Sequence, residues 1–187
     1  HFFKLHQMNV LQRIELCDVQ LSDQHITALN ALLNTCSVRL KSLNLSQNLL
    51  TSKGVKLLCA SLVTCSNLLA LDLSSNLISD SSSACLSETL FQLSRLKRFV
   101  IAKNRLSSHS AKSLISRFGN YNSVTEDLDF SYNEIGDDIG FMIAFLFQNV
   151  PSVFKSANLA CCGLTESSVL EIAKHIPTCA SLTHLDI

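Results

Sequence analysis

Cysteine, whose thiolate can act as a nucleophile, a metal ligand or a redox centre, occurs eight times in this chain. Thiols that bind zinc normally come as C-x-x-C pairs or Cys/His groups of defined spacing, and the sequence contains neither. The vicinal pair Cys161–Cys162 could be redox-active. We instead interpret the cysteines as reduced, buried thiols of an intracellular protein. Their positions are Cys17, Cys36, Cys59, Cys65, Cys85, Cys161, Cys162 and Cys179.

Other residue sets with catalytic spacing are also missing from the sequence. We find no G-x-S-x-G, H-E-x-x-H, phosphate-loop or G-x-G-x-x-G pattern. The six histidines follow no regular spacing. We therefore expect no catalytic, cofactor or metal site and a protein that is not an enzyme.

Length and composition indicate a folded domain with a substantial core. The chain has 187 residues, of which 47% are hydrophobic and 16% charged. Its formal net charge of zero does not favour nucleic acid or an anionic membrane as a partner. The longest apolar stretch, 139–147, is about half the length of a membrane span. No secretory signal pattern is present, and both ends look cut from a longer protein.

One phrase recurs along the chain, as LKSLNLSQNLL at 40–50 and LLALDLSSNLI at 68–78. Seven copies align in register and begin near residues 11, 40, 68, 96, 125, 154 and 182, with the seventh cut short. The spacing between copies is nearly constant, at about 28 residues. Positions one, four, six and eleven of each copy are mostly apolar, and position nine is mostly asparagine. This pattern resembles the leucine-rich repeat, and its period resembles the ribonuclease-inhibitor-like subfamily. Residues 1–10 would then be the end of a preceding segment, and 11–187 the repeat domain.

Each copy combines two periodicities. The L-x-L alternation has the period of two that a strand requires. In the second half of a copy, apolar residues such as Leu58, Leu62 and Cys65 fall at i, i+4 and i+7, on one helix face. Stacked copies join their strands into a parallel sheet and bury the helix faces. Because helices are wider than the strand spacing, we predict an α/β solenoid, or horseshoe, with the sheet concave and the helices convex.

The asparagines at position nine have a structural interpretation. An Asn side chain both donates and accepts hydrogen bonds, so it can satisfy the buried backbone where the chain leaves the strand. We predict a structural ladder in this column, and we expect an irregular or frayed first repeat because Val19 cannot contribute to it. The ladder residues are Asn48, Asn76, Asn104, Asn133 and Cys162.

Function is therefore expected on the surface. On the concave side, the fourth copy is basic, the fifth is acidic, and position five forms a mildly acidic stripe. We predict partner binding at Arg98, Asp127, Asp129 and Tyr132, because Tyr and Arg are frequent in binding hot spots. The alternative is that Arg98 and Asp127, in register on adjacent strands, only pair with each other.

On the convex side, Phe141 and Phe145 fall at helix positions that should face water, with Leu170 beside Phe141 in the next copy. An exposed apolar patch of this kind usually marks a contact. We predict that these residues meet another domain of the same longer chain, a partner or a second subunit. The alternative is a rotated helix that buries both rings locally.

The resemblance implies a non-catalytic scaffold that binds protein partners through the concave face or the convex patch, in an intracellular, cytoplasmic setting. One alternative is a GTPase-activating protein similar to the Ran GTPase activator, with Arg105 stabilising phosphoryl-transfer charge. The other is a structural segment of a larger receptor or of a cytoskeletal or ciliary complex. No cofactor and no nucleic-acid partner is expected.

Overall fold

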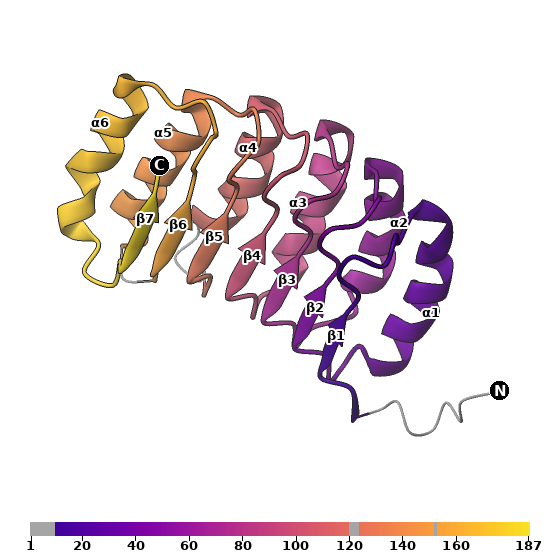
Figure 1. The fold of residues 1–187 in the computed structure, drawn as a ribbon. Helices are drawn as coiled ribbons and strands as arrows, with labels where there is room; N and C mark the ends of the chain where they lie inside the picture. Colours follow the sequence, from indigo (N-terminus) through magenta and orange to yellow (C-terminus); the bar gives the residue numbers. More distant parts are fainter. Residues whose placement is uncertain (1–9, 120–123, 152) are drawn as a thin grey trace.

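A computed structural model describes residues 10–119, 124–151 and 153–187, which form a curved stack of strand–helix units (Figure 1). The strands are β1 (Arg13–Glu15), β2 (Ser42–Asn44), β3 (Ala70–Asp72), β4 (Arg98–Val100), β5 (Asp127–Asp129), β6 (Ser156–Asn158) and β7 (His184–Asp186). The α-helices are α1 (Ile26–Cys36), α2 (Ser52–Leu62), α3 (Ser83–Gln92), α4 (Ser108–Ile115), α5 (Asp137–Asn149) and α6 (Glu166–His175). Short 3₁₀ segments are η2 (Asp23–His25), η3 (Asp80–Ser82), η4 (Ser116–Gly119) and η5 (Ile176–Thr178).

The described strands form one seven-stranded parallel sheet whose spatial order is the chain order. Equivalent positions of successive copies are paired, as in Leu43 with Leu71 and Arg98 with Asp127. The repeat alignment therefore predicts the strand register correctly.

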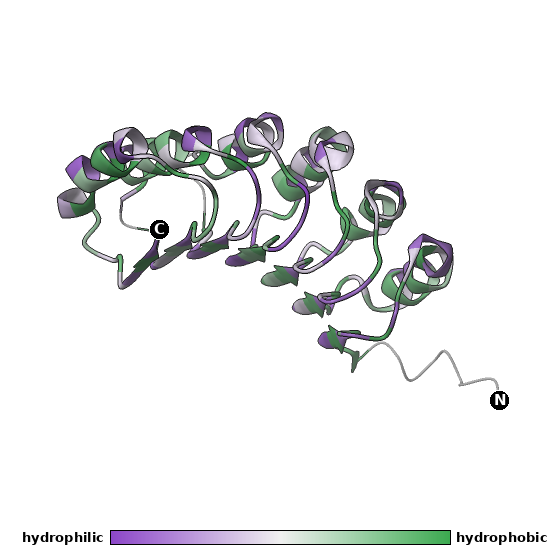
Figure 2. Ribbon diagram, turned by 45° about the horizontal axis from the view of Figure 1, so that its top comes forward, coloured by the Kyte–Doolittle hydropathy of each residue, from purple (hydrophilic) through white to green (hydrophobic). Residues whose placement is uncertain are grey.

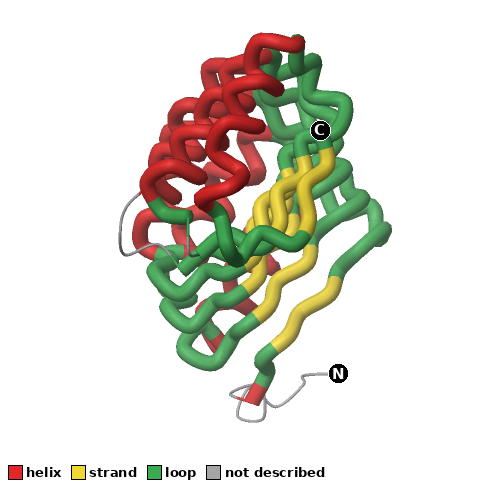
Figure 3. The backbone as a smooth tube through the Cα atoms, turned by 90° about the vertical axis from the view of Figure 1, so that its left-hand side faces the viewer, coloured by secondary structure: helices red, strands yellow, loops and turns green. Residues whose placement is uncertain are grey.

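The molecule has two layers. Strands line the inner side of the arc and helices the outer side (Figure 2), and the end-on view separates the layers clearly (Figure 3). Helices about 10 Å across cannot match strands about 4.8 Å apart unless the stack bends toward the strands. The predicted α/β solenoid, with its sheet concave and helices convex, is confirmed.

The core lies between the two layers. Leu43, Leu45, Leu58 and Leu62 are each at most 1% exposed. In the fourth and fifth copies, phenylalanine replaces leucine at several core positions. The ring of Phe99 packs against those of Phe118 and Phe130, with each pair of ring centres 6.0 Å apart.

A second set of contacts, near the helix N-termini, joins the first repeat to the second, the third to the fourth and the fifth to the sixth. Asp23, Asp80 and Asp137 each accept hydrogen bonds from the residue that caps the helix of the following repeat. The backbone N–H of Thr51 donates to Asp23 at 2.9 Å, and that of Thr165 donates to Asp137 at 2.7 Å. These carboxylates orient the capping side chains, because each capping hydroxyl also donates to them.

Candidate protein-binding surfaces

The asparagine column supports the turns after the strands. The Asn76 Nδ2 donates to the carbonyls of Leu45 and Leu73 at 3.0 and 3.1 Å, and its Oδ1 accepts from the Leu50 N–H at 3.0 Å. Asn48, Asn104 and Asn133 make the same kinds of bond, and the Cys162 thiol donates to the Phe130 carbonyl at 3.2 Å. The side chains of this column therefore support the scaffold: Asn48, Asn76, Asn133 and Cys162 are buried, and Asn104 is half-buried.

The turn backbone contains a feature that sequence reasoning missed. The residue before each ladder position has a positive φ between 52° and 57°, although none is glycine. In the first repeat both Asp18 and Gln20 are left-handed, on either side of Val19. The first turn therefore differs from the others where the asparagine is missing. The left-handed residues before the ladder are Asp18, Gln47, Ser75, Lys103, Tyr132 and Cys161.

Arg98 and Asp127 are in register on β4 and β5, yet they form no ion pair with each other. The alternative that they neutralise one another is therefore wrong. The neighbouring Glu126 accepts from Lys97 and Lys155 instead, each at 2.6 Å. Hydrogen bonds from Lys155 and Lys97 lower the pKa of Glu126. The ion pairs of Glu126 with Lys97 and Lys155 involve the residues that immediately precede strands β4, β5 and β6. They leave Arg98 and Asp127 on the concave face.

Asp129 lies beside a shallow hollow of about 180 Å³ on that face. Its Oδ1 accepts from the Ser131 N–H and hydroxyl at 3.0 and 2.7 Å. Its Oδ2 receives a longer bond, 3.4 Å, from Asn158 Nδ2. The hollow is also lined by Arg98, Asp127, Ser156 and His184, so polar groups of both signs surround it.

Tyr132 lies at the turn after β5, where 53% of its side chain is exposed. The Lys103 ammonium sits 5.0 Å from the ring centre. The electrostatic interaction with the neighbouring Cys161, and a hydrogen bond to it, raise the pKa of Tyr132. Tyr132 also lines a hollow of about 400 Å³ with Asn104, Arg105 and Glu134. An exposed aromatic ring beside a cation and a hollow is typical of a binding anchor.

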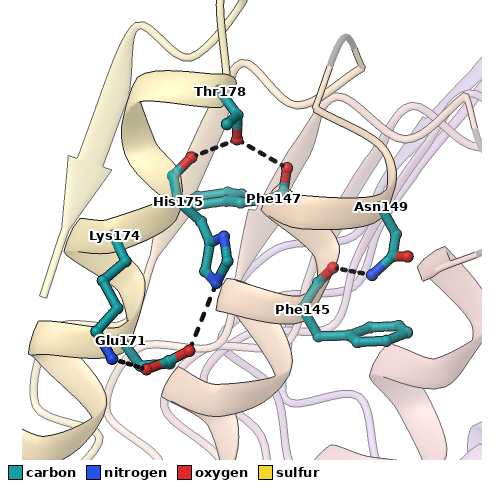
Figure 4. Close-up of polar contacts among 7 residues, drawn as sticks. All are labelled: Phe145, Phe147, Asn149, Glu171, Lys174, His175 and Thr178. Carbon is teal, nitrogen blue, oxygen red and sulfur yellow. Dashed lines mark hydrogen bonds and ion pairs between the residues drawn. The ribbon is translucent and has the colours of Figure 1, made fainter.

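The convex apolar patch, defined by Phe141, Phe145 and Leu170, is exposed by 43%, 50% and 55%. In Figure 4 the rings of Phe145 and Phe147 leave α5 in different directions; the Phe147 side chain is fully buried. The alternative of a rotated helix that buries both exposed rings is therefore wrong. Sequence reasoning missed Phe91, 59% exposed, whose ring lies 4.9 Å from the Arg117 guanidinium. The sequence feature that could have identified Phe91 as an exposed residue is a phenylalanine near the end of a repeat's helix.

All eight cysteines are free thiols. Cys36, Cys59, Cys65, Cys162 and Cys179 are buried as expected, but Cys17 and Cys161 are exposed. Cys17 follows the edge strand β1, and Cys161 occupies a left-handed turn, so neither side chain reaches the core. Burial raises the pKa of Cys59 to about 12 and that of Cys162 to about 11. These two thiols stay protonated and act as core residues.

Two further findings bear on the kind of site. In the described ranges, no group of three or more His, Cys, Asp or Glu side chains is arranged to hold a metal ion. Over the same residues, no helix combines the length and apolarity needed to cross a membrane.

Comparison with known proteins identifies the class. A family model described as "Leucine Rich repeat" matches residues 39–59, 64–86 and 126–144. The chain therefore contains leucine-rich repeats, and its fold is a leucine-rich repeat solenoid. No curated protein matches it.

Among solved structures, the chain is similar to the Arabidopsis receptor kinase HAESA, crystallised in complex with the peptide hormone IDA and the co-receptor SERK1. The TM-score is 0.52 and the sequence identity 18%, over 97% of this chain and 26% of that one. The chain thus spans about a quarter of that protein's length. At this identity the likeness shows the fold.

Proposed function

We propose that this chain is a non-catalytic protein-interaction module of the ribonuclease-inhibitor-like type. The observation that supports the proposal is the uncovered concave sheet face, where Arg98, Asp127 and Asp129 line one hollow, with Tyr132 exposed at the turn after β5. Leucine-rich repeat proteins typically serve as interaction scaffolds, and the similar receptor was crystallised with a peptide hormone and a co-receptor. The repeat period of about 28 residues supports the subfamily. The free thiols support an intracellular, cytoplasmic setting.

The convex apolar patch provides a second contact in this proposal, with another domain of the same longer chain or with a second copy. Phe141 and Phe145 lie one helical turn apart on α5, and Leu170 lies on the neighbouring α6. Because each of the three side chains is already about half buried, covering them would stabilise a contact by roughly half of the 1.5–3 kcal/mol that full burial of an exposed side chain contributes, or about 1 kcal/mol each.

The test compares wild type with a concave variant, Arg98→Ala with Tyr132→Ala, and a convex variant, Phe141→Ser with Phe145→Ser. A protein captured by wild type is purified, and its binding to all three is measured by calorimetry. Light scattering gives the oligomeric state. We expect about tenfold or greater weakening, or loss of self-association, in at least one variant with an unchanged melting temperature. Equal binding and equal mass in all three would contradict the proposal.

The GTPase-activating alternative is favoured by one observation: Arg105 is exposed and lines the hollow of about 400 Å³ beside Tyr132 and Glu134. Such an arginine could stabilise charge on a transferring phosphoryl group. Single-turnover GTP hydrolysis by Ran, with wild type and Arg105→Ala, decides between the two. If the wild-type chain stimulates GTP hydrolysis and Arg105→Ala abolishes that stimulation, the GTPase-activating function replaces the scaffold proposal. If the wild-type chain does not stimulate hydrolysis, the GTPase-activating alternative is wrong. A structural segment of a larger receptor or of a cytoskeletal or ciliary complex is the remaining alternative, and the partner's identity would reveal it.

A further inference from the structure

Negative charge on the concave face alternates from strand to strand. Position five carries a carboxylate in the odd repeats and a neutral residue in the even ones. Each carboxylate therefore lies two repeats, and two strands, from the next. The carboxylates are Glu15, Asp72, Asp129 and Asp186, and the residues between them are Asn44, Val100 and Asn158.

The turn does not require this charge. The Oδ1 of Asp72 accepts from the Ser74 N–H at 2.9 Å. In the even repeats Asn44 and Asn158 make the same bond, to the N–H groups of Ser46 and Ala160, at 2.9 and 3.1 Å. An amide can therefore make this backbone bond in place of a carboxylate, although Asp72 and Asp129 also accept from the hydroxyls of Ser74 and Ser131, at 2.6 and 2.7 Å. The backbone bond alone does not account for the negative charge at alternate strands.

Three of the four carboxylates are not neutralised by the protein. Arg13 pairs with Glu15 at 3.4 Å. Within the described residues, Asp72, Asp129 and Asp186 have no ion-pair partner. Arg98 lies two positions before Val100 on β4 and lines the same hollow as Asp129, but it forms no ion pair with that carboxylate.

The distance between successive position-five carboxylates, which form a row across the concave face, matches the repeat distance of one peptide conformation. Two strand spacings amount to about 9.4–9.8 Å, and somewhat less for side chains on the inside of the curve (Figure 2). One turn of polyproline II, three residues at about 3.1 Å each, advances about 9.3 Å and returns to the same face. Same-face residues of a β-strand are about 6.6–6.8 Å apart, and seven residues of an α-helix span about 10.5 Å. Neither stays in register over the whole row.

The floor between the carboxylates suits such a segment. Val100 lies between Asp72 and Asp129 and is apolar, with only 5% exposure. The neighbouring concave positions Ala70, Ser74 and Ala102 are small. An extended chain can therefore approach the sheet while its cations reach the carboxylates.

We propose that the concave face binds an extended partner segment in the polyproline II conformation, with an arginine or lysine at every third residue. The segment crosses the strands along the stack, and its cations pair with Asp72, Asp129 and Asp186. This inference rests on the proposed function and names the chemistry of the partner.

The experiment uses three labelled heptapeptides and fluorescence anisotropy at low ionic strength. RPPRPPR has the matching spacing, RPRPRPP has the same composition with arginine at every second residue, and EPPEPPE reverses the charge. We expect RPPRPPR to bind best, about tenfold more tightly than RPRPRPP, with an affinity that falls as salt is added. EPPEPPE should not bind. Equal affinity for the two arginine peptides would overturn the proposal.

The chain supplies its own conservative substitution, because asparagine already occupies position five in two even repeats. Asp72→Asn, Asp129→Asn and Asp186→Asn together should weaken RPPRPPR binding about tenfold or more without changing the melting temperature. The matched control is Glu88→Gln on the convex helix α3, which removes one exposed negative charge outside the concave face, with at most a twofold effect expected. An effect of Glu88→Gln equal to that of Asp129→Asn would show diffuse attraction and refute binding to the position-five carboxylates.

The two proposals fail in different ways. If no peptide binds but a purified partner still binds through Arg98 and Tyr132, the peptide chemistry is wrong and the scaffold proposal stands. If no partner binds and RPPRPPR shows no spacing preference, both are wrong.

Discussion

Asp80 shows how one side chain couples successive repeats. The Ser107 N–H donates to its Oδ1 at 2.8 Å, and the hydroxyls of Ser107 and Ser110 donate to the same carboxylate. Burial raises the pKa of Asp80, but the hydrogen bonds from Ser107 and Ser110 outweigh it, and the net pKa is lowered. The carboxylate therefore stabilises the folded chain only while it is ionised.

We expect Asp80→Asn to lower the free energy of unfolding by about 1–2 kcal/mol at pH 7. Because the folded-state pKa lies below the unfolded value of about 3.9, the benefit is present above pH 4 and is lost as pH falls through the folded pKa. Urea unfolding of both proteins at pH 7, 4 and about 2 measures this. The difference should shrink as the pH falls, whereas Glu88→Gln, at an exposed site, should have no effect at any pH. A constant difference would refute the charge-based explanation.

Gly140 determines how closely two elements pack. It lies on α5, where an added Cβ would fall 2.6 Å from the Cβ of Ser168 on α6 and 3.2 Å from Leu164. Ser168 is fully buried, and its hydroxyl donates to Asp137 at 2.5 Å. Helices α5 and α6 therefore pack closely because Gly140 has no side chain at their contact. This close packing allows the Ser168 hydroxyl to reach Asp137.

Gly140→Ala should lower the free energy of unfolding by about 1–3 kcal/mol, although alanine is favoured in helices by about 1 kcal/mol. Urea unfolding measures the change. In a Ser168→Gly background the clash with that side chain is removed, so the same substitution should become nearly neutral. A loss of equal size in both backgrounds would show that helix packing is not the cause.

At the scale of the whole molecule, stability depends on position in the stack. Each repeat buries its apolar face only against its neighbours, so the ends have one neighbour and the centre has two. Leu71, in the third repeat, is fully buried, whereas Leu11, at the start of the first, is half-buried. The loss in free energy of unfolding caused by an equivalent leucine substitution should therefore be larger in a central repeat than in a terminal one.

Leu71→Ala should reduce the free energy of unfolding by about 2–5 kcal/mol, the range for deleting a buried leucine side chain. Leu11→Ala should cost clearly less, because its site already meets solvent. Chemical denaturation of both variants under the same conditions gives the comparison. Equal costs would argue against a linear stack of repeats.

The sequence by itself determined the solenoid, its strand register and the places of the leucines and asparagines. These features recur at the same positions in most repeats, with Val19 and Cys162 as the exceptions to the asparagine column, and each repeat contacts only its neighbours, so the local pattern is enough. It also predicted which phenylalanines of α5 face outward, because helical spacing sets the face of each residue.

Only the tertiary structure decided which polar side chains meet between repeats. Arg98 and Asp127 are in register, yet Glu126 takes the lysines on both sides and Arg98 pairs with neither acid. Asp80 reaches the cap of the next helix, and Cys161 lies beside Tyr132 at a left-handed turn. Long side chains have many rotamers, and their partners depend on backbone separations of a few ångströms across a curved stack. The repeat pattern therefore predicts which positions are adjacent on neighbouring strands, but the three-dimensional geometry decides which side chains at those positions make contact.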